Sequence, residues 1–305
     1  MSPKWNPRLA LSFLVVLLAL SPMSAQIAPT LLNKPPSGGG TPTMEYHGGP
    51  VMTANPINTY IIWYGNWNAA GSDTPYTQAL IEHFLSTFGG TQLMLVNTGY
   101  SDATGAVSGN VAFGGSITNT STKNLNNIAI KKVVTNALSS GALPTDANAV
   151  YFVLTSSDVN ETSGFCSSYC GWHDHATING ADIKYAFVGN PDRCASSCEI
   201  QTTGPNSPAV GVGGADGMAN VMTHELSESV TDPDLDAWFD TSSGDENADL
   251  CNYNFGIHNL CGTGGLCTAA GNYTAADYNQ TFGNNNWMLQ MLWENTTPGA
   301  CVQHL

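Results

Sequence analysis

Hydrophobic and polar residues alternate along the chain in blocks that predict strands and helices in turn. Three short apolar runs, rich in β-branched and aromatic residues, predict strands at 58–64, 150–154 and 184–188. Apolar residues at helical spacing predict amphipathic helices at 76–88, which a Gly-Gly pair ends, and at 124–138. This succession predicts an α/β fold in which helices flank a mixed sheet. The Gly- and Asn-rich last third predicts a loop-rich part that disulfides stabilise.

The first residues predict export from the cell. Lys4 and Arg8 precede an apolar run at 9–20, and small residues follow, which gives residues 1–25 the three regions of a secretory signal peptide. The run is too short to cross a bilayer, because a membrane helix needs about 20 apolar residues. We therefore expect a secreted, extracellular protein without a membrane span.

Residues 26–43, with several prolines and three consecutive glycines, predict a disordered linker, and 44–305 predict one domain. The chain has 8 Lys and Arg against 23 Asp and Glu, so nucleic acid is excluded as a partner. Only 10% of residues are charged, and the chain has eight cysteines and 32 glycines. This composition is typical of extracellular proteins, in which disulfides and neutral loops replace ion pairs.

The most informative helix is predicted at 216–231. Asp216 is the expected N-cap, and Pro233 ends the helix because the residue before a proline is pushed out of helical geometry. Within it, His224 and Glu228 are four positions apart and face the same way, so both can hold one metal ion.

Glu225, the next residue after His224, is placed to reach a water on that ion as the catalytic base. The pattern is that of the H-E-x-x-H zinc-peptidase helix, with Glu in place of the second His. It predicts a zincin-like active-site helix. Because two carboxylates replace nitrogen ligands, calcium or manganese remain possible beside zinc.

A downstream segment resembles the thermolysin-like zinc peptidases. There a later Glu supplies the third ligand, and a nearby Asp orients the first His. The resemblance implies that Glu246 is the third ligand and that Asp249 lies behind His224 and orients its ring.

Acidic residues are dense in this region, because thirteen follow Arg193 and no Lys or Arg does. Nine of the thirteen lie between Glu225 and Asp249, a density that favours a bound cation. The run of Asp residues that begins at Asp232 is no EF-hand, because Ala237 stands where that motif needs Gly. A looser calcium site, or an ordinary solvated acidic loop, remains open.

Two further histidines, His173 and His175, are predicted on a loop. Either could be an extra metal ligand or stabilise an oxyanion, and we take His173 as the catalytic candidate. The alternative is a surface loop that carries an incidental histidine pair. No G-x-S-x-G motif supports serine hydrolase chemistry.

From about residue 46 to 302, the chain resembles the secreted EXORDIUM / phosphate-induced protein family. The resemblance rests on YHGGPV (46–51), IIWYG (61–65), VLTSSDV (153–159), FC to CGWH (165–173), YAFVGN (185–190), GADGM (214–218), VTDP (230–233) and the closing LW to C (292–301). It implies secretion and, in plants, a role in cell expansion, but no settled activity. Plant members carry small or apolar residues where this chain has His224, Glu225 and Glu228.

The cysteines at 166, 170, 194 and 198 share a spacing and match the family. We expect them to pair among themselves, and Cys301 to tie the C-terminus back. A zinc site of four thiolates is the rival interpretation.

Together, these patterns favour a secreted zinc metallopeptidase that cleaves a peptide or protein, neutral or basic rather than acidic. The alternative from another class is a non-catalytic extracellular or cell-wall-associated protein with a structural or calcium-binding acidic site. A carbohydrate-binding module is kept open only by the tryptophans, most of which are expected in the core.

Overall fold

A computed structural model describes residues 25–27, 42–121, 123–201, 204–207, 213–257 and 277–305. Its centre is a six-stranded sheet with the order β1-β6-β7-β5-β3-β4. The bounds are β1 (Ala25–Ile27), β3 (Ile57–Tyr64), β4 (Val111–Asn119), β5 (Ala149–Thr155), β6 (Gly171–Ile178) and β7 (Ala181–Val188). β4, β3, β5 and β7 are parallel to one another. β6 pairs antiparallel with β7, and β1 pairs antiparallel with β6 at the edge of the sheet.

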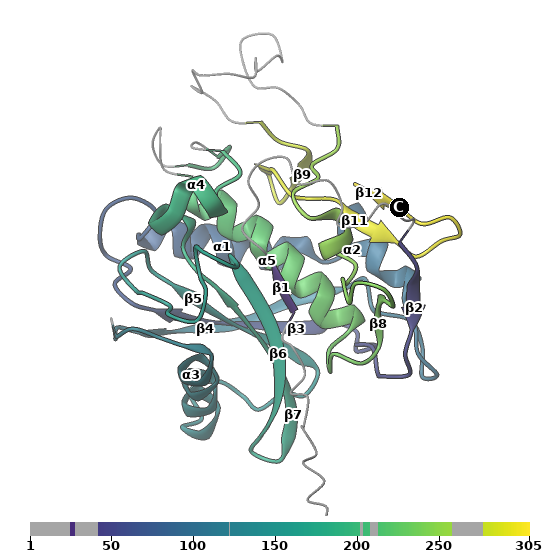
Figure 1. Cartoon of the computed structure of the whole chain (residues 1–305). Helices are drawn as coiled ribbons and strands as arrows, with labels where there is room; N and C mark the ends of the chain where they lie inside the picture. Colours follow the sequence, from purple (N-terminus) through teal and green to yellow (C-terminus); the bar gives the residue numbers. More distant parts are fainter. Residues whose placement is uncertain (1–24, 28–41, 122, 202–203, 208–212, 258–276) are drawn as a thin grey trace, which may run out of the picture.

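Three long helices flank the sheet: α1 (Pro75–Phe88), α3 (Asn127–Ser139) and α5 (Gly214–Thr231). Figure 1 shows α1 and α5 together on one face of the sheet and α3 on the other. The predicted α/β class, all three predicted strands and all three predicted helices are confirmed, with ends shifted by a few residues.

The remaining elements are short. They are α2 (Gln92–Leu95), α4 (Ala195–Cys198), the 3-10 turns η1 (Val96–Gly99), η2 (Pro191–Cys194) and η3 (Asp249–Cys251), and the strand pairs β2 (Met44–Tyr46) with β8 (Trp238–Asp240), β9 (Gln280–Phe282) with β10 (Asn285–Trp287), and β11 (Leu292–Glu294) with β12 (Ala300–Val302). Among the described residues of the last third, most therefore lie in loops, as the composition predicts.

Three disulfides join Cys166 to Cys194, Cys170 to Cys198 and Cys251 to Cys301. The first four cysteines pair among themselves and Cys301 ties the C-terminus to η3, as expected. Thiolates used in this way cannot form a four-cysteine zinc site. The other two cysteines lie outside the described residues.

Two sequence-based predictions about the N-terminal part meet the structure only partly. Of the predicted signal peptide, only residue 25 lies within the described residues. Of the predicted linker, residues 28–41 lie outside them, whereas Gln26 and Ile27 belong to β1. Within the described ranges, no helix combines the length and the apolar character that a membrane crossing requires.

Most of the tryptophans in the described residues belong to the core, while Trp238 is half-buried. Trp63, Trp67, Trp172 and Trp287 are buried, and Trp293 is only 7% exposed. Buried indoles stabilise the fold by removing apolar surface from water and leave no exposed platform for a sugar ring. The expectation that most of them lie in the core is confirmed for the described residues.

Candidate metal centre

Helix α5 runs through the middle of the molecule, and all 18 of its residues are buried. It packs against β6 and β7 on one side and α1 on another. The helix begins at Gly214, so Asp216 is not the N-cap as predicted; it lies in the first turn, where it accepts hydrogen bonds from Asn206. It ends at Thr231, before Asp232 and Pro233, as predicted.

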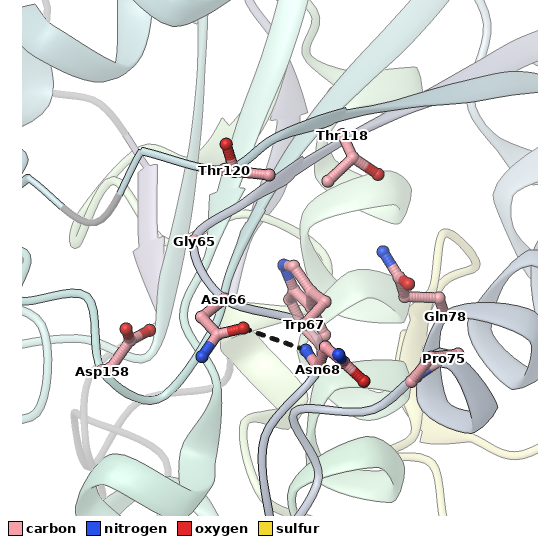
Figure 2. A pocket seen from close by; sticks show the side chains of 9 residues that line it. All are labelled: Gly65, Asn66, Trp67, Asn68, Pro75, Gln78, Thr118, Thr120 and Asp158. Atoms are coloured by element: carbon pink, nitrogen blue, oxygen red, sulfur yellow. Dashed lines mark hydrogen bonds between the residues drawn. The ribbon is translucent and has the colours of Figure 1, made fainter.

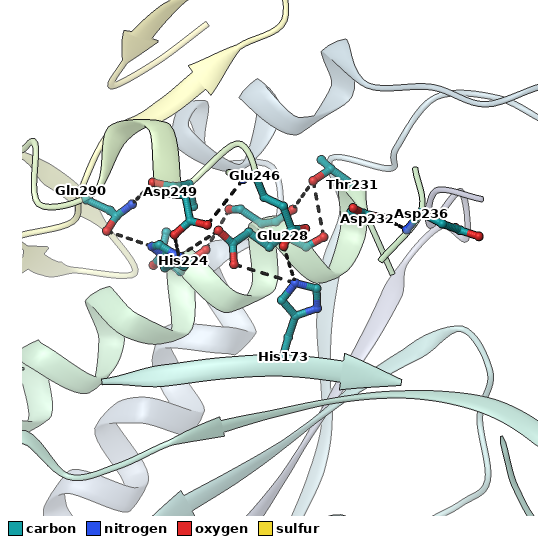
Figure 3. A network of polar contacts seen from close by, with 12 residues as sticks. His173, His224, Glu228, Thr231, Asp232, Asp236, Glu246, Asp249 and Gln290 are labelled. Carbon is teal, nitrogen blue, oxygen red and sulfur yellow. Dashed lines mark hydrogen bonds and ion pairs between the residues drawn. The ribbon is translucent and has the colours of Figure 1, made fainter. Parts of the chain in front are cut away.

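Three predicted site residues converge on this helix. Glu228 Oε1 lies 2.8 Å from His224 Nε2, one helical turn away, and Asp249 Oδ1 lies 3.4 Å from the same nitrogen. Figure 3 shows Asp249, on η3, reaching over the helix toward this pair. These ligand atoms lie within 4.8 Å of one another. Atoms that ligate one zinc ion are typically about 3 to 4 Å apart, so the spacing fits.

The partner of the other ring nitrogen of His224 decides which nitrogen can bind a metal. Nδ1 lies 3.2 Å from Gln290 Oε1, while Gln290 Nε2 donates to the carbonyl of Ala248 at 2.8 Å. Because the amide nitrogen is used at Ala248, the amide oxygen faces the ring and Nδ1 must carry the proton. Once Nε2 gives up its own proton to a cation, its lone pair faces Glu228 and Asp249, which is the tautomer that a metal ligand needs.

The residue at the far ring nitrogen differs from the prediction. Asp249 lies on the Nε2 side of His224, the side of Glu228, whereas Gln290, 66 positions further along the chain, faces Nδ1. Sequence reasoning missed Gln290 because nothing near it suggests metal chemistry.

His173 lies in β6, not on a loop, so the loop prediction is wrong. Its ring is 1% exposed, and Nε2 lies 3.1 Å from Glu246 Oε2 and 3.8 Å from Glu228 Oε2. Figure 3 shows the ring rising from the strand toward α5. Glu246 thus joins His173 and Glu228 in a second group of possible ligands, not the group of His224 as predicted.

Glu225 is buried between α5 and β6. A Cβ atom at Gly171 would lie 2.8 Å from its Oε1, so the carboxylate rests against the strand two residues before His173. Only glycine leaves room for it there. Since residues i and i+2 of a strand share a face, Glu225 and His173 meet the same face of β6.

Acidic side chains dominate the cluster, by which we mean His173, His224, Glu225, Glu228, Glu246 and Asp249. Burial and the carboxylates of Glu228 and Asp249 raise the pKa of Glu246 well above its ordinary value. Burial alone would lower the pKa of His224, but Glu228, Asp249 and Glu225 outweigh it and raise that pKa well above normal. Glu246 and His224 therefore retain protons that partly compensate the negative charge of the neighbouring carboxylates. A bound cation would take the place of these protons.

His173 behaves differently, because burial and the nearby His224 and His175 lower its pKa to about 3. It is neutral at physiological pH, as a metal ligand must be.

Several buried polar atoms of the cluster make no hydrogen bond of normal geometry within the described residues. They are both carboxylate oxygens of Glu228, Oε1 of Glu246, Nε2 of His224 and Nδ1 of His173. Buried polar atoms are nearly always satisfied, and unsatisfied ones are costly. Apart from Nδ1 of His173, these atoms belong to the groups that face one another, so the donor set fits a metal ion.

The acidic loop after α5 serves another purpose. Asp232 accepts the backbone N–H groups of Asp236 and Ala237 at 2.7 and 2.6 Å, and Asp240 accepts those of Ser242 and Ser243. These carboxylates hold turns of the backbone. The looser calcium site that the sequence left open has no support at these residues.

His175 belongs to a separate cluster with Asp182 and Asp234. Lys184 Nζ already lies 2.5 Å from Asp182 and 3.0 Å from Asp234, so a fixed ammonium compensates part of the charge of the two acids. Of the two histidines predicted near the metal, only His173 reaches the centre.

A model of the family described as "Phosphate-induced protein 1 conserved region" matches residues 44–303. The chain belongs to this family. Protein EXORDIUM-like 5 of Arabidopsis thaliana is 31% identical over 292 residues, which cover 85% of this chain and 77% of the relative. Protein EXORDIUM-like 3 of the same plant is 30% identical over 285 residues, covering 83% and 80%. No solved structure matches.

The phosphate-induced protein fold also forms a cleft of about 440 Å³ at the carboxyl ends of β3 and β4 (Figure 2). The strand order reverses beside β3, because β4, the next strand of the sheet, lies on one side of it and β5 on the other, and the carboxyl ends at such a reversal commonly bind ligands. Trp67, Gln78 and Asp158 line the cleft. None of the metal-centre residues does, so the two features are distinct.

Replacing Gln290 with Leu is expected to weaken zinc binding by this family member about 10- to 100-fold, because the orienting acceptor at His224 Nδ1 is lost. Competition with a chelator of known affinity measures the change. Gln280→Leu, in β9 and outside the cluster, is the matched control and should bind zinc as the wild type does. Equal affinities for all three proteins would contradict the tautomer assignment.

Asp216 is expected to make stability depend on pH. Burial raises its pKa to about 7, partly offset by hydrogen bonds from Asn206. Because the unfolded pKa is about 3.9, the folded state holds the extra proton, and this contribution is complete below pH 4 and lost as the pH rises through 7. Asp216→Asn should flatten the fall in unfolding free energy between pH 4 and 8, measured by denaturant titration. An unchanged slope would show that Asp216 is ionised in the fold.

Proposed function

We propose that the protein is a secreted metal-dependent hydrolase, most consistent with a zinc metallopeptidase. The observation that carries the proposal is the convergence of His224, Glu228 and Asp249 on one buried point of α5, with ligand atoms close enough for one ion. The proposal rests on this geometry, because the names of the relatives describe no activity.

Each side chain has a separate task in this proposal. His224, Glu228 and Asp249 hold the ion, and Gln290 fixes the ring of His224. A bound divalent cation acidifies a water and polarises a carbonyl group. Glu225, the neighbour of His224 on the buried helix, takes the proton as the water attacks, and returns it to the leaving amine.

Histidine in the donor set favours zinc over the harder cations. Calcium takes six to eight oxygen ligands, and this group of three offers only two carboxylates beside an imidazole. Zinc accepts a mixed nitrogen and oxygen set and keeps a fourth position for water. Manganese suits such a mixed set less well than zinc.

The proposed location is extracellular. A signal-like N-terminal segment precedes the family region, and three disulfides persist only in an oxidising compartment. The excess of 23 acidic over 8 basic residues favours a neutral or basic peptide substrate over an acidic one.

A second candidate, a structural metal site in a non-catalytic binding protein, is favoured by burial. The side chains of His224 and Glu228 are fully buried, and that of Asp249 is 17% exposed. A structural site has closed coordination, whereas a catalytic one keeps a position open.

Hydrolysis of fluorescence-quenched peptides separates the two candidates. The proposal predicts cleavage of neutral or basic peptides, its loss after chelation and its recovery with zinc. A metal-replete protein that cleaves none of a broad peptide library, yet unfolds on chelation, would support the structural candidate instead.

A further inference from the structure

The two carboxylate oxygens of Glu228 face two different histidines. Oε1 lies 2.8 Å from Nε2 of His224, and Oε2 lies 3.8 Å from Nε2 of His173. The two rings come from different elements, α5 and β6, and approach the carboxylate from different sides (Figure 3). A carboxylate that presents one oxygen to each of two ligand sets can bridge two metal ions.

Each side of Glu228 has its own additional carboxylate. On the His224 side, Asp249 Oδ1 lies 3.4 Å from the ring nitrogen. On the His173 side, Glu246 Oε2 lies 3.1 Å from the ring nitrogen. Both groups of three place their ligand atoms within 4.8 Å of one another, but the two histidines fall in separate groups. One ion therefore takes one histidine.

Charge gives an independent reason for a second cation. Glu228, Glu246 and Asp249 each bear a negative charge when they are ionised around a metal. The ion pairs of these three carboxylates within the described residues involve histidine only. One divalent cation would leave one of these three charges uncompensated in a largely buried cluster, which is costly, whereas a second cation removes the deficit.

We infer that the centre is dinuclear: Glu228 bridges one ion held by His224 and Asp249 and a second ion held by His173 and Glu246. This inference rests on the proposed metal-dependent function and assigns His173 and Glu246 a ligand role. Paired ions in hydrolytic sites are about 3.5–4 Å apart and hold both the attacking water and the substrate oxygen.

The rival arrangement has one ion at His224. In that case His173 only hydrogen-bonds Glu246 and positions it, and its removal changes no metal count. The two arrangements therefore differ in stoichiometry, which can be measured without an activity assay.

Full-length secreted protein, stripped with a chelator and dialysed against zinc, should bind two equivalents. His173→Ala should bind one. If His173→Ala fails to fold, Glu246→Gln replaces it in the experiment and should also bind one equivalent. Glutamine keeps the shape of the Glu246 side chain, and burial raises the pKa of Glu246, so the neutral amide is tolerated there. His175→Ala, two residues along the same strand, is the matched control and should keep both equivalents.

Diffraction from crystals soaked in zinc gives the second readout, with two anomalous peaks about 3.5–4 Å apart expected on either side of Glu228. One equivalent that His173→Ala leaves unchanged would overturn the dinuclear inference but preserve the proposed function. Loss of an equivalent in His175→Ala would also overturn the dinuclear inference, since the second ion would then lie in the separate cluster of His175, Asp182 and Asp234. No zinc at all would defeat both proposals.

Discussion

Glu225→Gln is expected to lower the rate of peptide hydrolysis about 10²- to 10⁴-fold, the usual contribution of a general base. Glutamine keeps the shape of the side chain against Gly171 but cannot accept the proton. Because Glu225 belongs to neither group of possible ligands, the zinc content should stay unchanged. Steady-state kinetics and metal analysis on the same preparation measure both quantities.

Glu199→Gln is the matched control for this substitution. Glu199 is 7% exposed and lies outside the cluster, and burial beside Asp192 raises its pKa to about 8, so a neutral side chain changes little there. This variant should hydrolyse peptides at the wild-type rate. If Glu225→Gln were as active as Glu199→Gln, Glu225 could not be the base.

Removing the metal is expected to have the largest effect on stability. A ligand that binds only the folded state stabilises it by about 4 kcal/mol at a free concentration 1,000 times its Kd. Without a cation, retained protons compensate the fully buried Glu228 and its carboxylate neighbours only in part, so chelation should lower the unfolding free energy by about this order. Denaturant unfolding at pH 7, with disulfides intact, measures the difference.

His224→Ala provides the internal comparison for chelation. Because the variant lacks the first ligand, its unfolding free energy should respond much less to the chelator than that of the wild type. A wild type whose stability is the same with and without chelator would show that the cluster binds no structural or catalytic ion.

Local patterns predict the parts of this molecule that depend on local geometry. The i, i+4 spacing of His224 and Glu228 predicts their shared direction, because helical geometry fixes it within one turn. The strands at 58–64 and 150–154 are predicted for a similar reason, since runs of buried β-branched and aromatic residues suit a central parallel sheet.

Contacts between distant segments are not predicted. Glu246 and Asp249 are three residues apart, and this spacing indicates one shared face, yet they face different histidines because β6 brings His173 to one side of α5. β6 was missed because the polar side chains of His173 and His175 interrupt the apolar pattern by which a strand is recognised. Gln290 reaches His224 only through the packing of the C-terminal loops.

The most direct measurement is the metal content of the purified mature protein by mass spectrometry, beside the His224→Ala variant. A metal centre on α5 predicts at least one equivalent of zinc in the wild type and a clear loss in the variant. Calcium alone, or no metal with the two proteins indistinguishable, would contradict the assignment of this buried cluster as a hydrolytic metal centre.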